Sequence, residues 1–134
     1  MPAQILIVDD YLGVRITLRE LLDWHSFQVC GDAKDGKEAI EKVIEFKPDI
    51  VLLDIDMPGM NGVKTAQEIR RISPATKIVF LTIHDTPAVT QGTRLWSDGF
   101  VLKSAAGTEL IPTLNRLAGI LLDGSTKSGR AASD

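Results

Sequence analysis

Short apolar runs alternate with segments of helical period along most of this chain, and this alternation restricts its possible folds more than any other feature. The apolar runs predict strands at residues 4–8, 27–31, 49–53, 77–82 and 99–102. The intervening patterns predict helices near residues 12–24, 36–46, 62–72, 86–95 and 108–122. Strands and helices that alternate in this way are typical of βα units around a parallel sheet. We therefore expect an α/β domain.

The first, third and fourth apolar runs consist almost entirely of Ile, Val, Leu and Phe. Strands as apolar as these suit the centre of a sheet whose two faces are both covered by helices. The second run, over residues 27–31, alternates more between apolar and polar side chains, so we place it at an edge. Its cysteine, Cys30, is interpreted as a small buried side chain rather than a reactive group.

Composition excludes several classes of protein. Of the 134 residues, 44% are hydrophobic and 25% are charged, which is the balance of a globular domain with one core. The formal net charge of −3 argues against direct binding of nucleic acid by this chain. No run approaches the ~18 apolar residues of a membrane span, and the N-terminus lacks a signal-peptide pattern. The single cysteine excludes an internal disulfide and favours a cytoplasmic location.

The end of the chain differs in character from the rest. In the last predicted helix, Thr108 is expected to cap the N-terminus, and Pro112 is expected in or near the first turn, where it is tolerated. From Asp123 onward the sequence contains no large apolar residue. We therefore expect residues 1–122 to form one domain and residues 123–134 to be a flexible tail or the start of an interdomain linker.

Three carboxylates stand where apolar runs end. Asp9 and Asp10 follow the first run, and Asp54 follows the third. Because the carboxyl ends of parallel strands meet at one edge of the sheet, we expect these acids to lie together there. Clustered anions raise one another's pKa values, so a fold that keeps them is expected to hold a cation, usually a hard divalent metal. The alternative for Asp9 and Asp10 is a helix N-cap.

Two further polar side chains belong to the same predicted edge. Thr82 ends the fourth strand and Lys103 follows the fifth. An Asp can act as a nucleophile toward phosphorus and form an aspartyl phosphate, while a Lys ammonium and a Thr hydroxyl can contact phosphoryl oxygens. Mg²⁺ prefers such carboxylate oxygens and neutralises charge on a transferring phosphoryl group. The cluster therefore predicts phosphoryl transfer onto a carboxylate.

Four motifs in chain order resemble the receiver domain of bacterial two-component response regulators. They are residues 5–10 (ILIVDD), 51–62 (VLLDIDMPGMNG), 79–82 (VFLT) and 98–103 (DGFVLK). The resemblance covers about residues 4–122 and implies a flavodoxin-like (βα)5 domain. Its five-stranded parallel sheet would have the order 2-1-3-4-5, with helices on both faces. The segment 100–105 is most similar to the subfamily whose output domain is a LuxR-type helix-turn-helix.

The resemblance also implies a role for each acid. Asp54 would accept a phosphoryl group from a sensor histidine kinase. Asp10 and Asp54 would hold Mg²⁺ together with the backbone carbonyl of Asp56, while Asp9 would act through water. Such a domain is not an enzyme in the usual sense, because it catalyses only its own phosphorylation and dephosphorylation.

The remaining implied roles concern switching and partners. Lys103 would bind the phosphoryl group, Thr82 would move toward it, and Phe100 would move inward. These movements would alter the surface made by the fourth predicted helix, the fifth strand and the fifth helix. That surface is the expected site of homodimerisation, and transcription is the expected output. DNA would be contacted only by an output domain outside this chain, and no membrane contact is expected.

Four positions depart from the pattern that many relatives share. Phe100 stands where many have Tyr, so a switch here works without a phenolic hydroxyl. Ser104 replaces a common Pro, which leaves the isomer of the Lys103–Ser104 peptide bond open. Ile83 is larger than the usual residue and is expected to narrow access to the phosphorylation site. Trp96 falls in a stretch that usually holds small residues, near the expected output surface.

Three other functions fit parts of this pattern. The Asp54-Ile55-Asp56 sequence resembles the paired acids of haloacid-dehalogenase-type phosphatases, in which the second Asp is a general acid. However, Pro58 stands where that motif has Thr or Val, and the motif normally follows the first strand. A flavin-binding flavodoxin is disfavoured because no Ser/Thr/Gly-rich loop follows the first strand. A receiver-like scaffold that works without phosphorylation stays open.

Overall fold

The computed structural model describes residues 2–57, 61–83 and 96–124, with side chains as far as residue 119. Its five strands are β1 (Gln4–Val8), β2 (Gln28–Ala33), β3 (Ile50–Asp54), β4 (Lys77–Thr82) and β5 (Gly99–Leu102). Its helices are α1 (Leu12–Trp24), α2 (Gly36–Phe46), α3 (Gly62–Ile72), the short 3-10 helix η1 (Lys103–Ala105) and α5 (Ala106–Gly124). The predicted helix over 86–95 lies outside the described residues.

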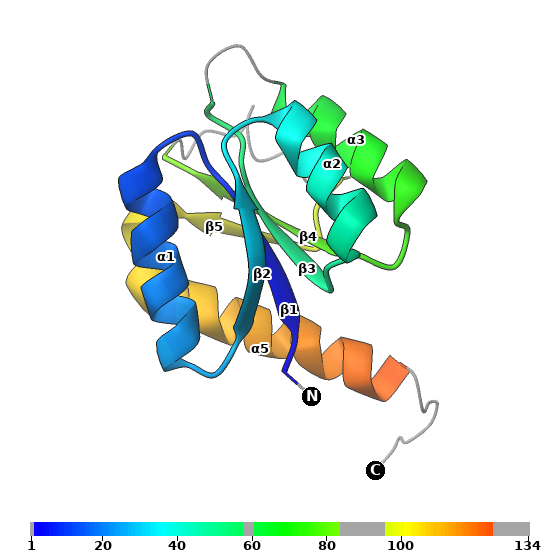
Figure 1. The fold of residues 1–134 in the computed structure, drawn as a ribbon. Coiled ribbons are helices and arrows are strands. Elements are labelled where there is room, and N and C mark those ends of the chain that lie inside the picture. Colours follow the sequence, from blue (N-terminus) through cyan, green and yellow to red (C-terminus); the bar gives the residue numbers. More distant parts are fainter. Residues whose placement is uncertain (1, 58–60, 84–95, 125–134) are drawn as a thin grey trace.

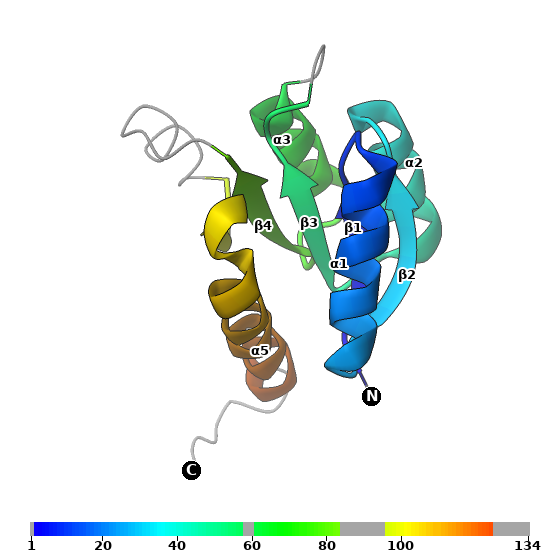
Figure 2. The ribbon, with the colours of Figure 1, turned by 90° about the vertical axis from the view of Figure 1, so that its left-hand side faces the viewer.

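All pairings in the single five-stranded sheet are parallel, and the strand order is β2-β1-β3-β4-β5. Helices α1 and α5 cover one face of the sheet and α2 and α3 cover the other (Figures 1 and 2). The predicted α/β class, strand order and two-sided helix cover are confirmed, and β2 lies at an edge as expected. Among the described residues, no helix has the length and hydropathy needed to cross a lipid bilayer.

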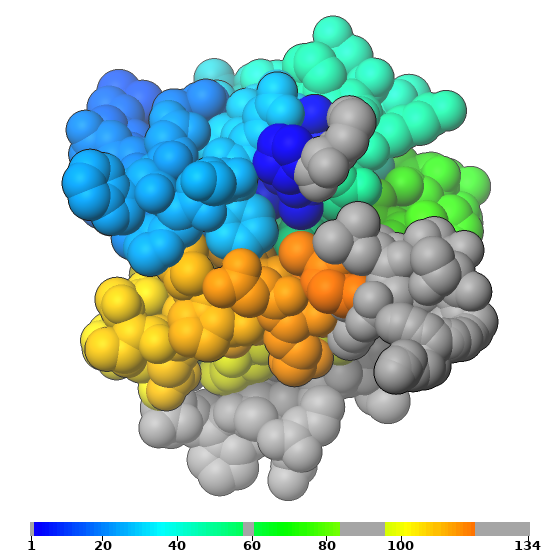
Figure 3. Space-filling view, turned by 90° about the horizontal axis from the view of Figure 1, so that it is seen from below, coloured from blue at the N-terminus to red at the C-terminus, as the bar shows by residue number. Residues whose placement is uncertain are grey.

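The core consists of two clusters because successive strand residues point to opposite faces of the sheet. The strand residues that pack against α1 and α5 are Ile5, Ile7, Ile50, Leu52, Val79, Leu81 and Val101. Those that pack against α2 and α3 are Leu6, Val8, Ala33, Val51, Leu53, Ile78 and Phe80. In the space-filling view of Figure 3, the surfaces of α1 and α5 lie side by side. Burial on both faces explains why the central strands are continuously apolar.

Strand β2 differs from its prediction because it starts at Gln28 and continues to Ala33. Pairing with β1 carries the strand through Gly31, although glycine has low strand propensity. An extra residue, Cys30, lies between the partners of Ile5 and Leu6, which marks an irregularity in the register. Cys30 is half-buried, its thiol lies 3.5 Å from the Ile5 carbonyl oxygen, and burial raises its pKa.

Helices α1, α2 and α3 have the predicted bounds, and the last two begin with side-chain caps. The Asp35 carboxylate accepts a hydrogen bond of 2.8 Å from the Glu38 amide at the start of α2. The Asn61 side chain accepts one of 3.1 Å from the Lys64 amide at the start of α3. These caps satisfy amide groups that the first turn of a helix leaves without partners.

The predicted start of α5 is wrong. The helix begins at Ala106, directly after η1, so Thr108 lies in its first turn instead of capping it. The Thr108 hydroxyl donates to the Ala105 carbonyl at 3.2 Å, and Pro112 falls inside the helix beyond its first turn. The 3-10 turn of η1 runs directly into α5 through Ala106, whose backbone is already helical, so the helix starts before Thr108. Helix α5 also includes residues 123 and 124 of the expected tail.

Gly62 allows α3 to start close to the end of β3. A Cβ atom at this position would lie 2.8 Å from Ile55 Cγ2 and 2.9 Å from Ile55 Cα, which is too close for any side chain. Only glycine therefore fits at this close contact between the start of α3 and Ile55.

Candidate functional site

The carboxyl ends of β1 and β3 bring the three predicted acids together. One carboxylate oxygen from each of Asp9, Asp10 and Asp54 lies within 4.8 Å of the others. The register explains this, because Val8 pairs with Leu53, and Asp9 and Asp54 are the next residues along. The structure therefore shows the convergence that the sequence predicts.

Two of the three acids are buried. Asp9 is 0% exposed and Asp54 is 2% exposed, whereas Asp10 is half-buried. Burial penalises an ionised carboxylate because it removes hydration. Nearby donors and cations must offset that penalty if these side chains are to carry charge.

Lys103 supplies a cation from within the chain. Its Nζ donates to Asp9 Oδ2 at 2.9 Å and to Asp54 Oδ2 at 3.1 Å. Burial lowers the pKa of Lys103, but the hydrogen bonds and charges of Asp9 and Asp54 outweigh burial, and the net pKa is raised. The ammonium is therefore charged at neutral pH, and it offsets part of the repulsion between the acids. The sequence alone had suggested that a metal ion would do this.

The Asp54 carboxyl shows the balance between these effects. Its pKa is raised to about 6, mainly by burial and also by the neighbouring Asp9 charge. The Asp56 amide, which donates to Asp54 Oδ1 at 2.8 Å, and the Lys103 ammonium both act in the opposite direction. Asp54 is thus mainly ionised above pH 7.

Asp9 is held through both its side chain and its backbone, but it is not a helix cap, because α1 begins after Tyr11 and has no side-chain cap. Its Oδ1 accepts a hydrogen bond of 2.9 Å from the amide of Tyr11, the residue that precedes α1. Its backbone carbonyl accepts one of 2.7 Å from Arg15, which also forms a 3.1 Å ion pair with Asp32. Sequence reasoning missed Arg15, although a cation six residues past Asp9 on the first helix was a usable signal.

Thr82 lies at the end of β4 and is 0% exposed. Its hydroxyl donates to Asp56 Oδ2 at 2.8 Å, and the Ile83 amide donates to the same oxygen at 2.9 Å. For a receiver domain, the sequence predicts a role only for the backbone carbonyl of Asp56, so these side-chain contacts were not predicted. The structure shows that this side chain accepts two hydrogen bonds from the end of β4, while the Asp56 amide donates to Asp54.

The family profile of the response regulator receiver domain matches residues 5–115. The chain belongs to this family. Chemotaxis protein CheY of Thermotoga maritima is 34% identical over 119 residues, which cover 88% of this chain and 99% of that protein. Nitrate/nitrite response regulator protein NarL of Escherichia coli (strain K12) is 34% identical over 120 residues, which cover 87% of this chain but only 55% of NarL.

Solved structures agree with this assignment. A two-component response regulator of the LuxR family from Aurantimonas sp. SI85-9A1 has a TM-score of 0.83 and 32% identity, covering 89% of this chain and 87% of that one. Response regulator protein TrrA from Thermotoga maritima, in complex with Mg²⁺ and BeF, has a TM-score of 0.78 and 33% identity, covering 87% of this chain and 99% of that one. Family membership argues against the phosphatase and flavin-binding alternatives.

The structure describes the positions that the sequence analysis singled out as unusual. Phe100 on β5 and Trp96 just before it are half-buried and pack against the core cluster on the α2–α3 face. The Ile83 side chain is 67% exposed. Among the described residues no peptide bond is cis, so the Lys103–Ser104 bond is trans.

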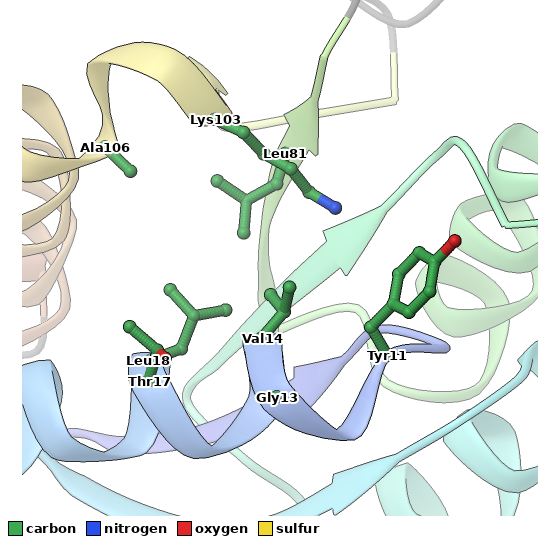
Figure 4. Close-up of a pocket in the computed structure, with 8 residues that line it drawn as sticks. All are labelled: Tyr11, Gly13, Val14, Thr17, Leu18, Leu81, Lys103 and Ala106. Atoms are coloured by element: carbon green, nitrogen blue, oxygen red, sulfur yellow. The ribbon is translucent and has the colours of Figure 1, made fainter.

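A pocket of about 610 Å³ opens beside the acid cluster of this receiver domain, between α1 and the start of α5. Its lining is mainly apolar and includes Val14, Leu18 and Leu81. Figure 4 shows Tyr11 at one end of the pocket, with the Lys103 amine extending toward that end. Lys103 is therefore accessible from one side while it contacts buried acids on the other.

Proposed function

We propose that this receiver domain accepts a phosphoryl group on Asp54 from a sensor histidine kinase, in a reaction that depends on Mg²⁺. The observation that best supports the proposal is the cluster itself. Three carboxylates converge within 4.8 Å, and Lys103 contacts two of them. A nucleophile, an oxygen-rich metal site and a cation that can contact phosphoryl oxygens thus share one sheet edge.

In the proposed transfer, a carboxylate oxygen of Asp54 forms a bond to phosphorus while the bond from phosphorus to the donor imidazole nitrogen breaks. The Asp54 pKa of about 6 leaves the carboxylate ionised and nucleophilic at neutral pH. The Lys103 ammonium lies 3.1 Å from Asp54 Oδ2, so it can contact a phosphoryl oxygen bound there and neutralise its charge.

The side chains present fit Mg²⁺, because the donor set consists of oxygens alone. We assign Asp10, Asp54 and the backbone carbonyl of Asp56 as ligands. Asp9, whose carboxylate accepts hydrogen bonds from Tyr11 and Lys103, keeps the indirect role through water that the family resemblance implies. When bound, Mg²⁺ would offset the negative charge of the acids and of the phosphoryl group. The likeness to TrrA, a relative that was solved with Mg²⁺ and BeF, supports this assignment.

Switching would follow from the new phosphoryl oxygens. Thr82 would turn toward the phosphoryl group, and Phe100, which is half-buried on β5, would move inward. Because Phe100 has no hydroxyl, its movement would be governed by packing alone. These shifts would reach the surface formed by the predicted helix over 86–95, β5 and α5.

The proposed output is control of transcription through that surface. The chain spans only 55% of NarL, and another similar structure is a DNA-binding response regulator of the LuxR family from Staphylococcus aureus. We therefore place any DNA contact in an output domain outside this chain, with residues 1–122 as the receiver and 123–134 as a tail or linker. A cytoplasmic location and homodimerisation through the switching surface complete the proposal.

The test is phosphorylation by a small-molecule donor. Incubation with Mg²⁺ and acetyl phosphate is expected to add one phosphoryl group, detected by intact mass. Asp54→Asn should remove the adduct, and Asp23→Asn, an exposed acid on α1, should not. A folded wild-type chain that gains no adduct would contradict the proposal. Size measurement with and without beryllofluoride would separate a phosphorylation-dependent dimer from a receiver-like scaffold that ignores the phosphoryl group.

A further inference from the structure

Two hydrogen-bond donors at the end of β4 meet on a single anionic oxygen. The Thr82 hydroxyl and the Ile83 amide donate to Asp56 Oδ2 at 2.8 and 2.9 Å. Thr82 is fully buried, whereas Asp56 is half-buried at the rim of the acid cluster. The carboxylate of Asp56 is therefore bound as an anion by the chain itself.

The same donors lie beside the place where a phosphoryl group would form. Asp54 pairs with Leu81 across the β3–β4 register, so Thr82 and Ile83 are the next two residues beyond its partner. A hydroxyl and an amide each have one proton to donate. While these protons are donated to Asp56, they are not donated to a phosphoryl oxygen on Asp54.

We propose that Asp56 is a positioning residue whose carboxylate occupies the Thr82 hydroxyl and the Ile83 amide and competes with the phosphoryl group for both donors. The inference rests on the proposed role of Asp54 as phosphoryl acceptor. Its physical basis is that a carboxylate oxygen and a phosphoryl oxygen are alike as anionic acceptors. Asp56 then sets how strongly the phosphoryl group must attract Thr82 before the domain switches.

The geometry also explains how the hold is released. The Asp56 amide donates to Asp54 Oδ1 at 2.8 Å, so a backbone hydrogen bond links the two residues directly. Negative charge added to Asp54 repels the Asp56 carboxylate. This repulsion weakens the hydrogen bonds that Asp56 accepts from Thr82 and Ile83. The competing explanation is that Asp56 acts on an incoming anion by charge repulsion alone, without involving Thr82.

The hydrogen bonding of Asp56 to these donors can be measured without any phosphoryl group. The Ile83 side chain is 67% exposed, so its amide should exchange quickly with solvent unless Asp56 accepts from it. Hydrogen exchange by NMR is expected to show protection in the wild type and in Asp56→Asn, which keeps an acceptor oxygen. Asp56→Ala should lose at least about tenfold of that protection. Equal exchange in the wild type and Asp56→Ala would overturn the inference whatever happens at Asp54.

The competition is tested by titrating the Mg²⁺-loaded protein with beryllofluoride. Asp56→Ala is expected to tighten binding about tenfold, which corresponds to about 1.4 kcal/mol. The increase in affinity caused by Asp56→Ala should persist in a Thr82→Ser background, which keeps the hydroxyl. It should fall to about threefold or less in a Thr82→Val background, which lacks the hydroxyl. An equal gain in all backgrounds would show charge repulsion alone and would overturn the inference, as would no gain. If the folded wild type binds no beryllofluoride, the proposed function fails as well, and the exchange experiment still decides whether the hold exists.

Discussion

Lys103 Nζ lies 2.9 Å from Asp9 Oδ2, although 94 positions separate the two residues in the chain. The Asp9 carboxylate is 0% exposed, and the Lys103 side chain is 21% exposed. This pair joins the residue after the first strand to the residue after the fifth. The ion pair therefore also links the ends of β1 and β5 across the sheet.

Removal of the Lys103 ammonium is expected to destabilise the protein, because it leaves two buried carboxylates facing each other. In Lys103→Met without metal, the free energy of unfolding in urea should fall by about 3 kcal/mol at pH 7.5. Added Mg²⁺ should recover part of the loss. Lys103→Arg keeps the charge and serves as the control. An unchanged urea midpoint in Lys103→Met would show that the acids do not depend on this cation.

The raised pKa of Asp54 predicts an unusual pH dependence. The pKa is about 6 in the folded protein and 3.8 as a model value, so the folded state binds this proton more tightly than the unfolded chain does. The stability contributed by the protonated carboxyl is complete below pH 4 and is lost as the pH rises through 6. Asp54→Asn should therefore be more stable than the wild type at pH 7.5 by up to about 3 kcal/mol, with the difference vanishing near pH 4. Urea unfolding of both proteins across this pH range in EDTA measures the difference in their free energy of unfolding. A difference that does not vary with pH would contradict the raised pKa of Asp54.

A methyl group at Gly62 is expected to push α3 away from β3. The added Cβ would lie within 3 Å of both Ile55 Cα and Ile55 Cγ2. Gly62→Ala should lower the free energy of unfolding by about 1–3 kcal/mol and weaken phosphorylation at the neighbouring Asp54. The matched control is Gly107→Ala in α5, where nothing lies within 4 Å of the added atom. That change should stabilise the protein slightly, by up to about 1 kcal/mol. Similar effects at both positions would show that the contact with Ile55 is unimportant.

The sheet could be predicted from the sequence because its strands carry their own signal. The central strands are buried on both faces, and only Ile, Val, Leu and Phe suit such positions. The start of α5 could not be predicted in this way. The pattern around Thr108 favours a cap, but η1 runs directly into α5 before Thr108 is reached, and no residue pattern predicts that short 3-10 helix.

The acids of the site were predictable for a similar reason, since strand ends of a parallel sheet share an edge. Their partners were not. Arg15 donates to the Asp9 carbonyl, and the Asp56 carboxylate accepts a hydrogen bond from the Thr82 hydroxyl. Both contacts depend on how helices and loops fold back over the sheet, and a strand-by-strand interpretation contains no such information.

The long separation between Asp9 and Lys103 has a consequence for how the protein is made. A chain that has left the ribosome as far as the end of β4 already contains every acid of the cluster. It still lacks the ammonium that contacts two of them. The ion pairs between Lys103 and the acids can therefore form only after the fifth strand has been synthesised, and an incomplete chain holds these acids without their cation.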